Sequence, residues 1–477
     1  MGLWTLFGWA TLLLLALALI CFLLYCGYIQ YIHMKYDHIP GPPRDSFIFG
    51  QSPTILKLMK NKKVVYDQFL DWVQKYGPVI RINAFHRVLV LVNSPEGVKE
   101  FLMSPKYSKD EVYDHVATLY GMRFMGKGLV TDKDHDHWYK QRRMMDPAFS
   151  RTYLMDLMGP FNEKAEELME KLSEKADGKN DTEMHNLFSR VTLDVIAKVA
   201  FGMELNSLND DLTPLPQAIS LVMNGIVETR NPMIKYSLAK RGFIREVQSS
   251  IRLLRQTGKE CIERRQKQIQ DGEEIPVDIL THILKAAGQE TTANQLSFAV
   301  MELGRNPEIL QKAQEEIDEV IGSKRFIEHE DLGKLHYLSQ VLKESLRLYP
   351  TAPGTSRGVK EEIVIEGVRI PPNSTVMFNS YIMGRMEQYY TDPLTFNPDR
   401  FSPDAPKPYY TYFPFSLGPR SCIGQVFSQM EAKIVMAKLL QRFDFELAKG
   451  QSFRIFDTGS LRPMDGVICR LRPRTKP

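Results

Sequence analysis

The distribution of apolar residues separates a short N-terminal segment from the rest of the chain. Residues 2–32 contain no Lys, Arg, Asp or Glu, and residues 12–24 are almost wholly aliphatic. About 20 apolar residues in a helix cross the hydrocarbon core of a bilayer. A cleavable signal peptide, the competing interpretation, has a basic n-region and a shorter apolar core. The pattern therefore predicts an uncleaved transmembrane anchor over residues 3–29.

A proline-rich hinge is predicted over residues 36–44, where three prolines within four positions prevent a helix from continuing. The nearest basic side chains, Lys35 and Arg44, follow the apolar span. By the positive-inside rule, this order predicts that the bulk of the chain faces the cytosol. The glycosylation sequons at Asn180 and Asn373 are then expected to carry no glycan.

After the hinge, the pattern predicts a mostly α fold with small β-sheets. Alternating and β-branched residues over 79–92 indicate a β-hairpin that turns near residues 84–86. Strands are also predicted over residues 363–370. Helical periodicity predicts helices over residues 65–76, 162–176, 190–201, 247–270, 307–321, 339–348 and 425–440. Since no Pro/Gly/Ser-rich linker interrupts the chain, we expect one catalytic domain over residues 45–477.

Composition narrows the function classes. The net charge of +4 is modest and the basic residues form no long run, so nucleic acid is not an expected partner. The five cysteines are scattered and show no CxxC spacing. This usage indicates a reducing compartment rather than a disulfide scaffold.

The most specific chemical signal is a glycine-bracketed loop with one cysteine. Residues 415–424 read FSLGPRSCIG and directly precede a predicted helix. The helix N-terminus favours the thiolate form of Cys422. Gly418 and Gly424 allow a tight turn and close approach to a flat partner, and Arg420 can pair with a carboxylate. The alternative is a buried structural cysteine.

The spacing Phe-x-x-Gly-x-Arg-x-Cys-x-Gly, from Phe415 to Gly424, resembles the haem-binding loop of the cytochrome P450 family. The resemblance implies the cytochrome P450 fold and a haem b cofactor. It also implies that Cys422 is the axial ligand of the haem iron and that Arg420 meets a haem propionate. Thiolate ligation favours cleavage of the O–O bond.

A second resemblance concerns a charge network. Glu344 and Arg347 are three residues apart and share one helix face. Alone they would be an ordinary surface pair, worth less than about 1 kcal/mol. Together with the Pro-x-Arg-Phe segment that contains Arg400, they resemble the ExxR helix of the family and its partner arginine. The resemblance implies a buried network beneath the haem.

Two further segments resemble propionate-binding positions of the family. Trp138 and Arg142 match a WxxxR helix and lie one helical turn apart, so both side chains can reach one ligand. Arg357 resembles the arginine that leads into the strand after the ExxR helix.

The distal motif is where the chain departs from the family. Residues 287–292 read AGQETT and resemble A-G-x-[DE]-T, which implies that Glu290 and Thr291 deliver protons to dioxygen. A helix-capping stretch is the alternative. About 20 residues that normally precede this motif, up to about 30 Å of helix, are missing before Ala287. Either the distal helix is shortened, or residues 278–286 serve as its first half.

Residues 337–350, 392–401 and 412–418 resemble the cholesterol 24-hydroxylase branch of the family. The resemblance implies hydroxylation of a sterol side chain with O₂ and with electrons from NADPH through NADPH–cytochrome P450 reductase. It implies a single-pass protein of the endoplasmic reticulum membrane. The basic residues that could steer an acidic reductase, unless they form only a solvated surface, are Lys140, Arg142, Arg143 and Lys433.

Two rival functions stay open at this point. One is a haem-thiolate enzyme that isomerises or dehydrates its substrate without a reductase, which the Glu290–Thr291 pair argues against. The other is a haem-binding but inactive isoform, caused by the missing part of the distal helix before Ala287.

Overall fold

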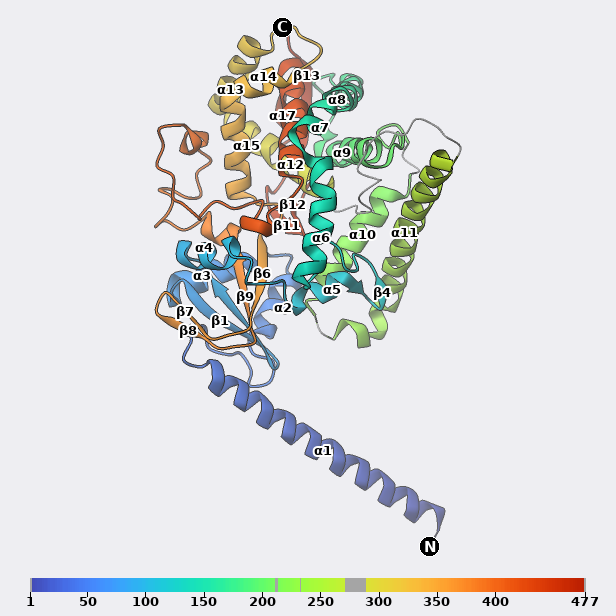
Figure 1. Ribbon diagram of the computed structural model, residues 1–477, viewed down its shortest axis with the longest axis vertical. Helices are drawn as coiled ribbons and strands as arrows, with labels where there is room; N and C mark the ends of the chain where they lie inside the picture. Colours follow the sequence, from blue (N-terminus) through green and yellow to red (C-terminus); the bar gives the residue numbers. More distant parts are fainter. Residues whose placement is uncertain (1, 211–212, 232, 271–288, 476–477) are drawn as a thin grey trace.

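The computed structural model describes residues 2–210, 213–231, 233–270 and 289–475, and shows a long helix that projects from a mostly helical body (Figure 1). The longer helices of the body are α2 (Ser52–Lys60), α3 (Val65–Tyr76), α4 (Pro95–Met103), α6 (His135–Met145), α8 (Met158–Ser173), α9 (Met184–Phe201), α10 (Leu215–Glu228), α11 (Arg241–Gln270), α12 (Gln289–Arg305), α13 (Pro307–Val320), α15 (His336–Leu348) and α17 (Gln425–Arg442). The short ones are α5 (Asp114–Ala117), α7 (Arg151–Asp156), α14 (His329–Lys334) and α16 (Ser380–Met383). The predicted class, mostly α with small β-sheets, is confirmed.

The projecting helix α1 (Leu3–Tyr36) is apolar and largely exposed over the segment predicted as an anchor. It is long and apolar enough to cross a membrane over Phe7–Tyr36. The helix continues past residue 29 because Ile29, Ile32 and Tyr36 lie on one face and are buried against the body. The Tyr36 hydroxyl also lies 2.9 Å from the Ser374 hydroxyl.

The predicted hinge is pinned to the body rather than free. The Arg81 N–H donates to the Pro40 carbonyl at 2.8 Å, and Gln51 donates to the Pro42 carbonyl at 3.0 Å. A side chain on Gly41 would place its Cβ 2.6 Å from the Arg81 carbonyl oxygen, so only glycine allows this approach. The segment therefore holds α1 at a fixed angle to the sheet.

The largest sheet has the strand order β1-β2-β9-β6, with β1 (Val79–Ala84), β2 (Arg87–Val92), β6 (Gly354–Val359) and β9 (Ser374–Asn379). β1 and β2 form the predicted hairpin, in register from Val79 opposite Val92 to Ala84 opposite Arg87. β2 runs parallel to β9, and β6 is antiparallel to β9. Two sequence-distant parts of the chain thus build one sheet, beside which α3 and α4 lie (Figure 1).

Smaller sheets complete the β structure. The strands predicted over residues 363–370 form a separate hairpin of β7 (Ile363–Ile365) and β8 (Val368–Ile370). The other strands are β3 (Thr118–Leu119), β4 (Met122–Arg123), β5 (Thr182–Glu183), β10 (Phe443–Leu447), β11 (Ile455–Asp457), β12 (Leu461–Pro463) and β13 (Ile468–Pro473).

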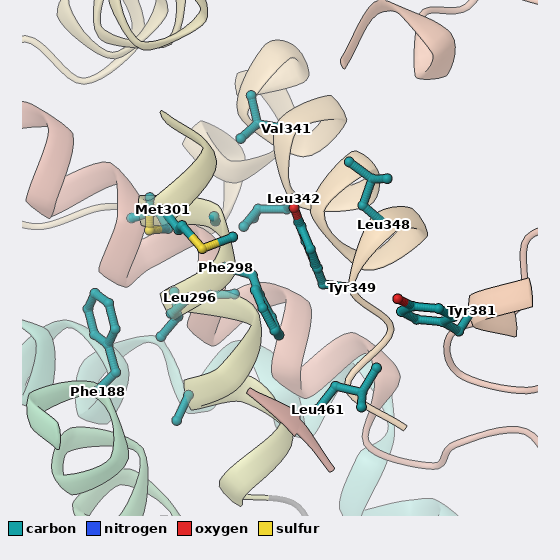
Figure 2. Close-up of a cluster of buried hydrophobic side chains, with 14 of the residues drawn as sticks. Phe188, Leu296, Phe298, Met301, Val341, Leu342, Leu348, Tyr349, Tyr381 and Leu461 are labelled. Carbon is teal, nitrogen blue, oxygen red and sulfur yellow. The ribbon is translucent and has the colours of Figure 1, made fainter. Parts of the chain in front are cut away.

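α12 runs through the centre of the body, packed between α9, α15, α17 and β12. Figure 2 shows Leu296, Phe298 and Met301 of this helix among side chains from neighbouring elements. The rings of Phe298 and Tyr349 stack with centroids 4.4 Å apart. All three α12 side chains are essentially inaccessible to solvent, so this part of the helix is held on every side. The predicted second half of the distal helix, residues 291–305, is confirmed as part of α12.

Candidate functional site

The loop over residues 415–424 leads directly into α17, as predicted. The Cys422 N–H donates to the Phe415 carbonyl at 2.8 Å, which closes the loop upon itself. Gly418 has φ +66 and begins the short 3-10 turn Gly418–Arg420. A Cβ on Gly418 would lie 2.2 Å from the Leu102 carbonyl oxygen of α4. Both the left-handed backbone and this close approach therefore require glycine.

Gly424, the cap of α17, has no such steric requirement. A Cβ there would lie 3.9 Å from both the Cys422 sulfur and the Phe149 ring, which is ordinary contact. Its φ is −84, which any residue can adopt. A need for glycine at this position would therefore come from a bound partner close to the loop.

The Cys422 thiol is accessible although the loop lies among surrounding protein. Burial raises the pKa of the Cys422 thiol, while the Gly424 N–H and Arg142 act in the opposite direction. Of these effects, the Gly424 N–H at the start of α17 acts in the direction that the sequence predicts for the helix N-terminus, toward the thiolate. A metal cation bound to this sulfur would favour the thiolate further, since it deprotonates a coordinating thiol.

Trp138 and Arg420, expected from two separate motifs to bind one group, lie against each other. The Trp138 ring is buried, and the Arg420 guanidinium carbon lies 3.9 Å from its centroid. Arg420 also donates to the Asp132 carbonyl at 3.0 Å. The cation–π contact fixes the plane of the guanidinium.

Arg142 connects α6 to the cysteine loop. Its guanidinium donates to the Ser421 carbonyl at 2.8 Å and to the Asp146 carboxylate at 2.9 Å. The residue before Cys422 is thereby tied to the helix that contains Trp138. Because the Arg142 guanidinium already donates to two protein acceptors, its contacts in this structure position the loop.

Two arginines near the cysteine loop each have one guanidinium nitrogen without a hydrogen-bond acceptor among the described residues. The buried Nη2 atoms of Arg357 and Arg420 have no hydrogen-bond partner among the described residues. Burial and, next, the charge of Arg357 lower the pKa of Arg420 to about 10, so the two guanidinium groups are close enough to repel. Such an arrangement is satisfied by an anion with carboxylate geometry. These residues fit the propionates of a haem.

Lys109 joins these two arginines, which the sequence did not indicate. Its ammonium donates to the Tyr113 hydroxyl at 2.6 Å and to the Thr355 hydroxyl at 2.9 Å. Burial lowers the pKa of Lys109, and the charges of Arg357 and Arg420 lower it further. The same lysine lowers the pKa of Tyr113. No local pattern marks Lys109, because it lies in an irregular segment before α5.

Glu344, Arg347 and Arg400 meet as a charge network. The Arg347 Nε and Nη2 donate to the two Glu344 carboxylate oxygens at 2.7 and 2.8 Å, and neither side chain is exposed. The Arg400 Nε lies 3.3 Å from Glu344 Oε1. The Asn397 N–H donates to the same oxygen at 2.8 Å. The network therefore joins α15 to the turn Pro398–Phe401 upstream of the cysteine loop.

On the distal side, the structure describes only part of the expected motif. Ala287, Gly288 and the segment 278–286 lie outside the described residues, as does the side chain of Glu290. Thr291 lies in the first turn of α12 and lines a cavity of about 1220 Å³. The Thr292 hydroxyl and the Glu431 Oε1 atom are both buried without a hydrogen-bond partner. The pKa of Glu431 is raised to about 8 by burial.

The comparisons with known proteins agree with this site. The sequence model of the family described as Cytochrome P450 matches residues 40–469. Cytochrome P450 3A6 of Oryctolagus cuniculus is 26% identical, over 98% of this chain and 98% of its own length. Cytochrome P450 4d2 of Drosophila melanogaster is 27% identical over 91% and 94%, respectively. Protein LUTEIN DEFICIENT 5, chloroplastic, of Arabidopsis thaliana is 28% identical over 87% and 74%.

The alignment with the Oryctolagus cuniculus relative extends over 503 positions, whereas the whole chain has 477 residues. That relative therefore contains residues with no counterpart in this chain.

Proposed function

Because the chain belongs to the cytochrome P450 family, we propose that it is a haem-thiolate monooxygenase that hydroxylates the side chain of a sterol. The observation that carries this proposal is the geometry around Cys422. One accessible thiol lies at the start of α17, and Arg357 and Arg420 each present a buried, unpartnered guanidinium nitrogen nearby. A flat cofactor with a metal centre and carboxylate arms matches both features.

Each residue of the proximal side then has a distinct task. Cys422 would hold the iron through its sulfur, and Arg357, Arg420 and Lys109 would hold the propionates. Bound haem would supply the activation of dioxygen. Arg142 keeps the loop in place through the Ser421 carbonyl. Glu344 and Arg347 form the buried pair that holds the turn Pro398–Phe401, upstream of the cysteine loop.

The distal side would supply the substrate and protons. Thr291 lines the cavity together with apolar side chains of α9 and α10, including Leu193, Ile196 and Ile219. These side chains favour an apolar substrate body through burial of its surface. We assign proton transfer to the Thr291 hydroxyl, with Glu290 as its relay.

Electrons would come from NADPH through NADPH–cytochrome P450 reductase. Lys140 and Arg143 are exposed on α6, the helix that also holds Trp138 against Arg420. Exposed cations there are suited to steering an acidic partner. Lys433 is less suited, because its ammonium donates to the Leu332 carbonyl at 2.9 Å and burial lowers its pKa.

The proposed location is the endoplasmic reticulum membrane, with α1 as a single anchor and the body in the cytosol. The exposed apolar side chains of α1 support the anchor, and Lys35 and Arg44 at its body end support the orientation. Expression in microsomes tests this arrangement. Asn180 and Asn373 should carry no glycan, and glycan on either would place the body in the lumen.

A haem-binding but inactive isoform is the second candidate, because the residues directly before Ala287 leave no room for the first half of the distal helix that the family resemblance implies. Two measurements separate the candidates. A thiolate-type Soret band in the carbon monoxide difference spectrum of the reduced protein shows that the proximal side forms. NADPH-dependent hydroxylation of a sterol with added reductase then shows activity, and a normal band without turnover supports the inactive isoform.

A further inference from the structure

The cavity next to Thr291 has an uneven distribution of charge. Its lining includes five cationic side chains, those of Arg123, Lys127, Arg252, Arg255 and Lys259, and no carboxylate among the described residues. The remaining lining is mainly Leu, Ile, Met and Phe. The charged part of the lining is thus entirely cationic among the described residues. A site for an uncharged ligand needs only a few neutral polar groups beside its apolar lining.

The cations gather at the exposed end of the cavity. Arg252, Arg255 and Lys259 follow the spacing i, i+3, i+7, so they form one stripe on α11 that is about 10 Å long. All three are exposed, whereas Leu193 and Ala197 of α9 at the other end are buried. Figure 1 shows α11 and β4, which contains Arg123, at the same side of the body.

These cations lack acidic partners. Within the described part of the chain, no carboxylate lies at ion-pair distance from Arg123, Arg252 or Arg255, and only Lys259 has one, Glu263 at 3.4 Å. Arg255 donates instead to the Arg123 carbonyl at 3.3 Å. The contact joins α11 to the end of β4 and places the Arg255 guanidinium beside the backbone of Arg123. Because Arg123, Arg252 and Arg255 have no carboxylate partner among the described residues, their charge is available to a ligand.

We propose that this cavity binds an amphiphile with an anionic head group, the head at Arg123, Arg252 and Arg255 and the apolar body extending toward Thr291. The inference rests on the proposed function, because it specifies the substrate class of the same site. Arginine recognises a carboxylate through paired, charge-assisted hydrogen bonds. A volume of about 1220 Å³ exceeds that of most drug-sized sites and leaves room for a long acyl chain or a sterol skeleton.

Matched ligand pairs test this proposal on the full-length, haem-loaded chain in a neutral detergent. Equilibrium dialysis with labelled ligands compares palmitate with hexadecanol, and cholesterol hemisuccinate with cholesterol. In at least one pair the anion should bind about tenfold more tightly. The pair that shows the preference identifies the apolar body as acyl or sterol. Equal affinities within both pairs would overturn the proposal.

Two double variants test where the preference arises. In Arg252→Gln/Arg255→Gln, the anion should lose about tenfold in affinity while the neutral ligand changes less than about twofold. Arg241→Gln/Arg245→Gln removes the same charge from exposed positions of α11 that do not line the cavity, and should leave both affinities unchanged. An equal loss in both double variants would show a general charge effect instead and would contradict the site. Dialysis measures ligand binding and does not depend on the ligation of the haem iron. If the carbon monoxide spectrum lacks the thiolate-type band but the anion still binds more tightly than the neutral ligand, only the proposed function is rejected.

Discussion

The central carbon of the Arg420 guanidinium lies 3.9 Å from the centroid of the Trp138 ring. This contact joins the cysteine loop to α6. A cation–π pair in a desolvated position contributes up to about 2 kcal/mol, whereas exposed pairs contribute about 0.5–1 kcal/mol. Since Trp138 is buried, the pair belongs to the first class.

A double-mutant cycle measures this coupling. We expect Trp138→Leu and Arg420→Gln to be non-additive by about 1–2 kcal/mol in urea unfolding. Tyr139 and Arg143 on the same helix form a matched exposed pair at 5.9 Å, for which the coupling should be about 0.5 kcal/mol, the lower end of the range for exposed pairs. A coupling for Trp138 and Arg420 no larger than that of the exposed pair would contradict this account.

Replacing Arg347 with Ala should destabilise the protein by about 3–5 kcal/mol and abolish haem incorporation. The variant leaves the fully buried carboxylate of Glu344 without its bidentate partner. Urea unfolding and haem content per chain measure the two effects. Lys106→Ala removes one member of an exposed ion pair with Glu361 and should cost less than about 1 kcal/mol. Normal haem content in Arg347→Ala would refute the role of the network.

Gly418→Ala should destabilise the loop through two separable effects. The left-handed backbone costs an alanine about 1 kcal/mol, and the Cβ clash with the Leu102 carbonyl adds to this cost. Gly121→Ala is the matched control, because Gly121 has φ +78 with nothing within 4 Å of a Cβ. Thermal unfolding should show a clearly larger loss for Gly418→Ala. Equal losses would mean that α4 yields to the added methyl group.

The sequence was sufficient for features that depend on local periodicity or on a motif of fixed spacing. The helix over residues 65–76 is α3, and the hairpin over residues 79–92 is confirmed with its turn near residues 84–86. Both follow from patterns within one element. The motif residues of the cysteine loop, of α6 and of α15 were identified for the same reason.

Features that depend on long-range pairing were missed. β9 pairs with β2, more than 260 residues earlier in the chain, and β6 pairs with β9. No local alternation marks either strand. Lys109 approaches Arg357 because the segment that contains it lies along β6, where the Gly358 N–H donates to the Ser108 carbonyl at 3.0 Å. The direction of the Cys422 pKa shift also depends on burial, which outweighs the opposite effect of the neighbouring Gly424 N–H. Each of these follows from tertiary packing.

Stability should depend on the ionisation of Glu431. Burial raises its pKa to about 8, so the folded state retains a proton that the unfolded chain, with a carboxyl pKa near 4.3, has lost. The free energy of unfolding therefore falls as the pH rises between these two pKa values, by about 1.4 kcal/mol per pH unit. It levels off above about pH 8, where the folded protein has also lost the proton.

The Glu431→Gln variant isolates this dependence, because the amide is neutral at every pH. Between pH 5.5 and 7.5, urea unfolding should show the wild-type protein losing about 3 kcal/mol relative to the variant. His185, whose pKa is lowered to about 4 by burial, is present in both proteins and cancels in the difference. A difference that does not change with pH would mean that Glu431 is ionised in the folded protein.

Truncation within α1 should separate the membrane anchor from the part of the helix that supports the body. A chain that begins at Tyr25 lacks most of the exposed apolar segment but retains Ile29, Ile32 and Tyr36, which are buried. Its body should unfold at the same urea concentration as the full chain. A chain that begins at Asp37 loses all three side chains and the hydrogen bond to Ser374. At about 1.5–3 kcal/mol for each buried side chain, it should be less stable by about 4.5–9 kcal/mol. Equal stability of the two truncated chains would show that the last turns of α1 rest on the body without stabilising it.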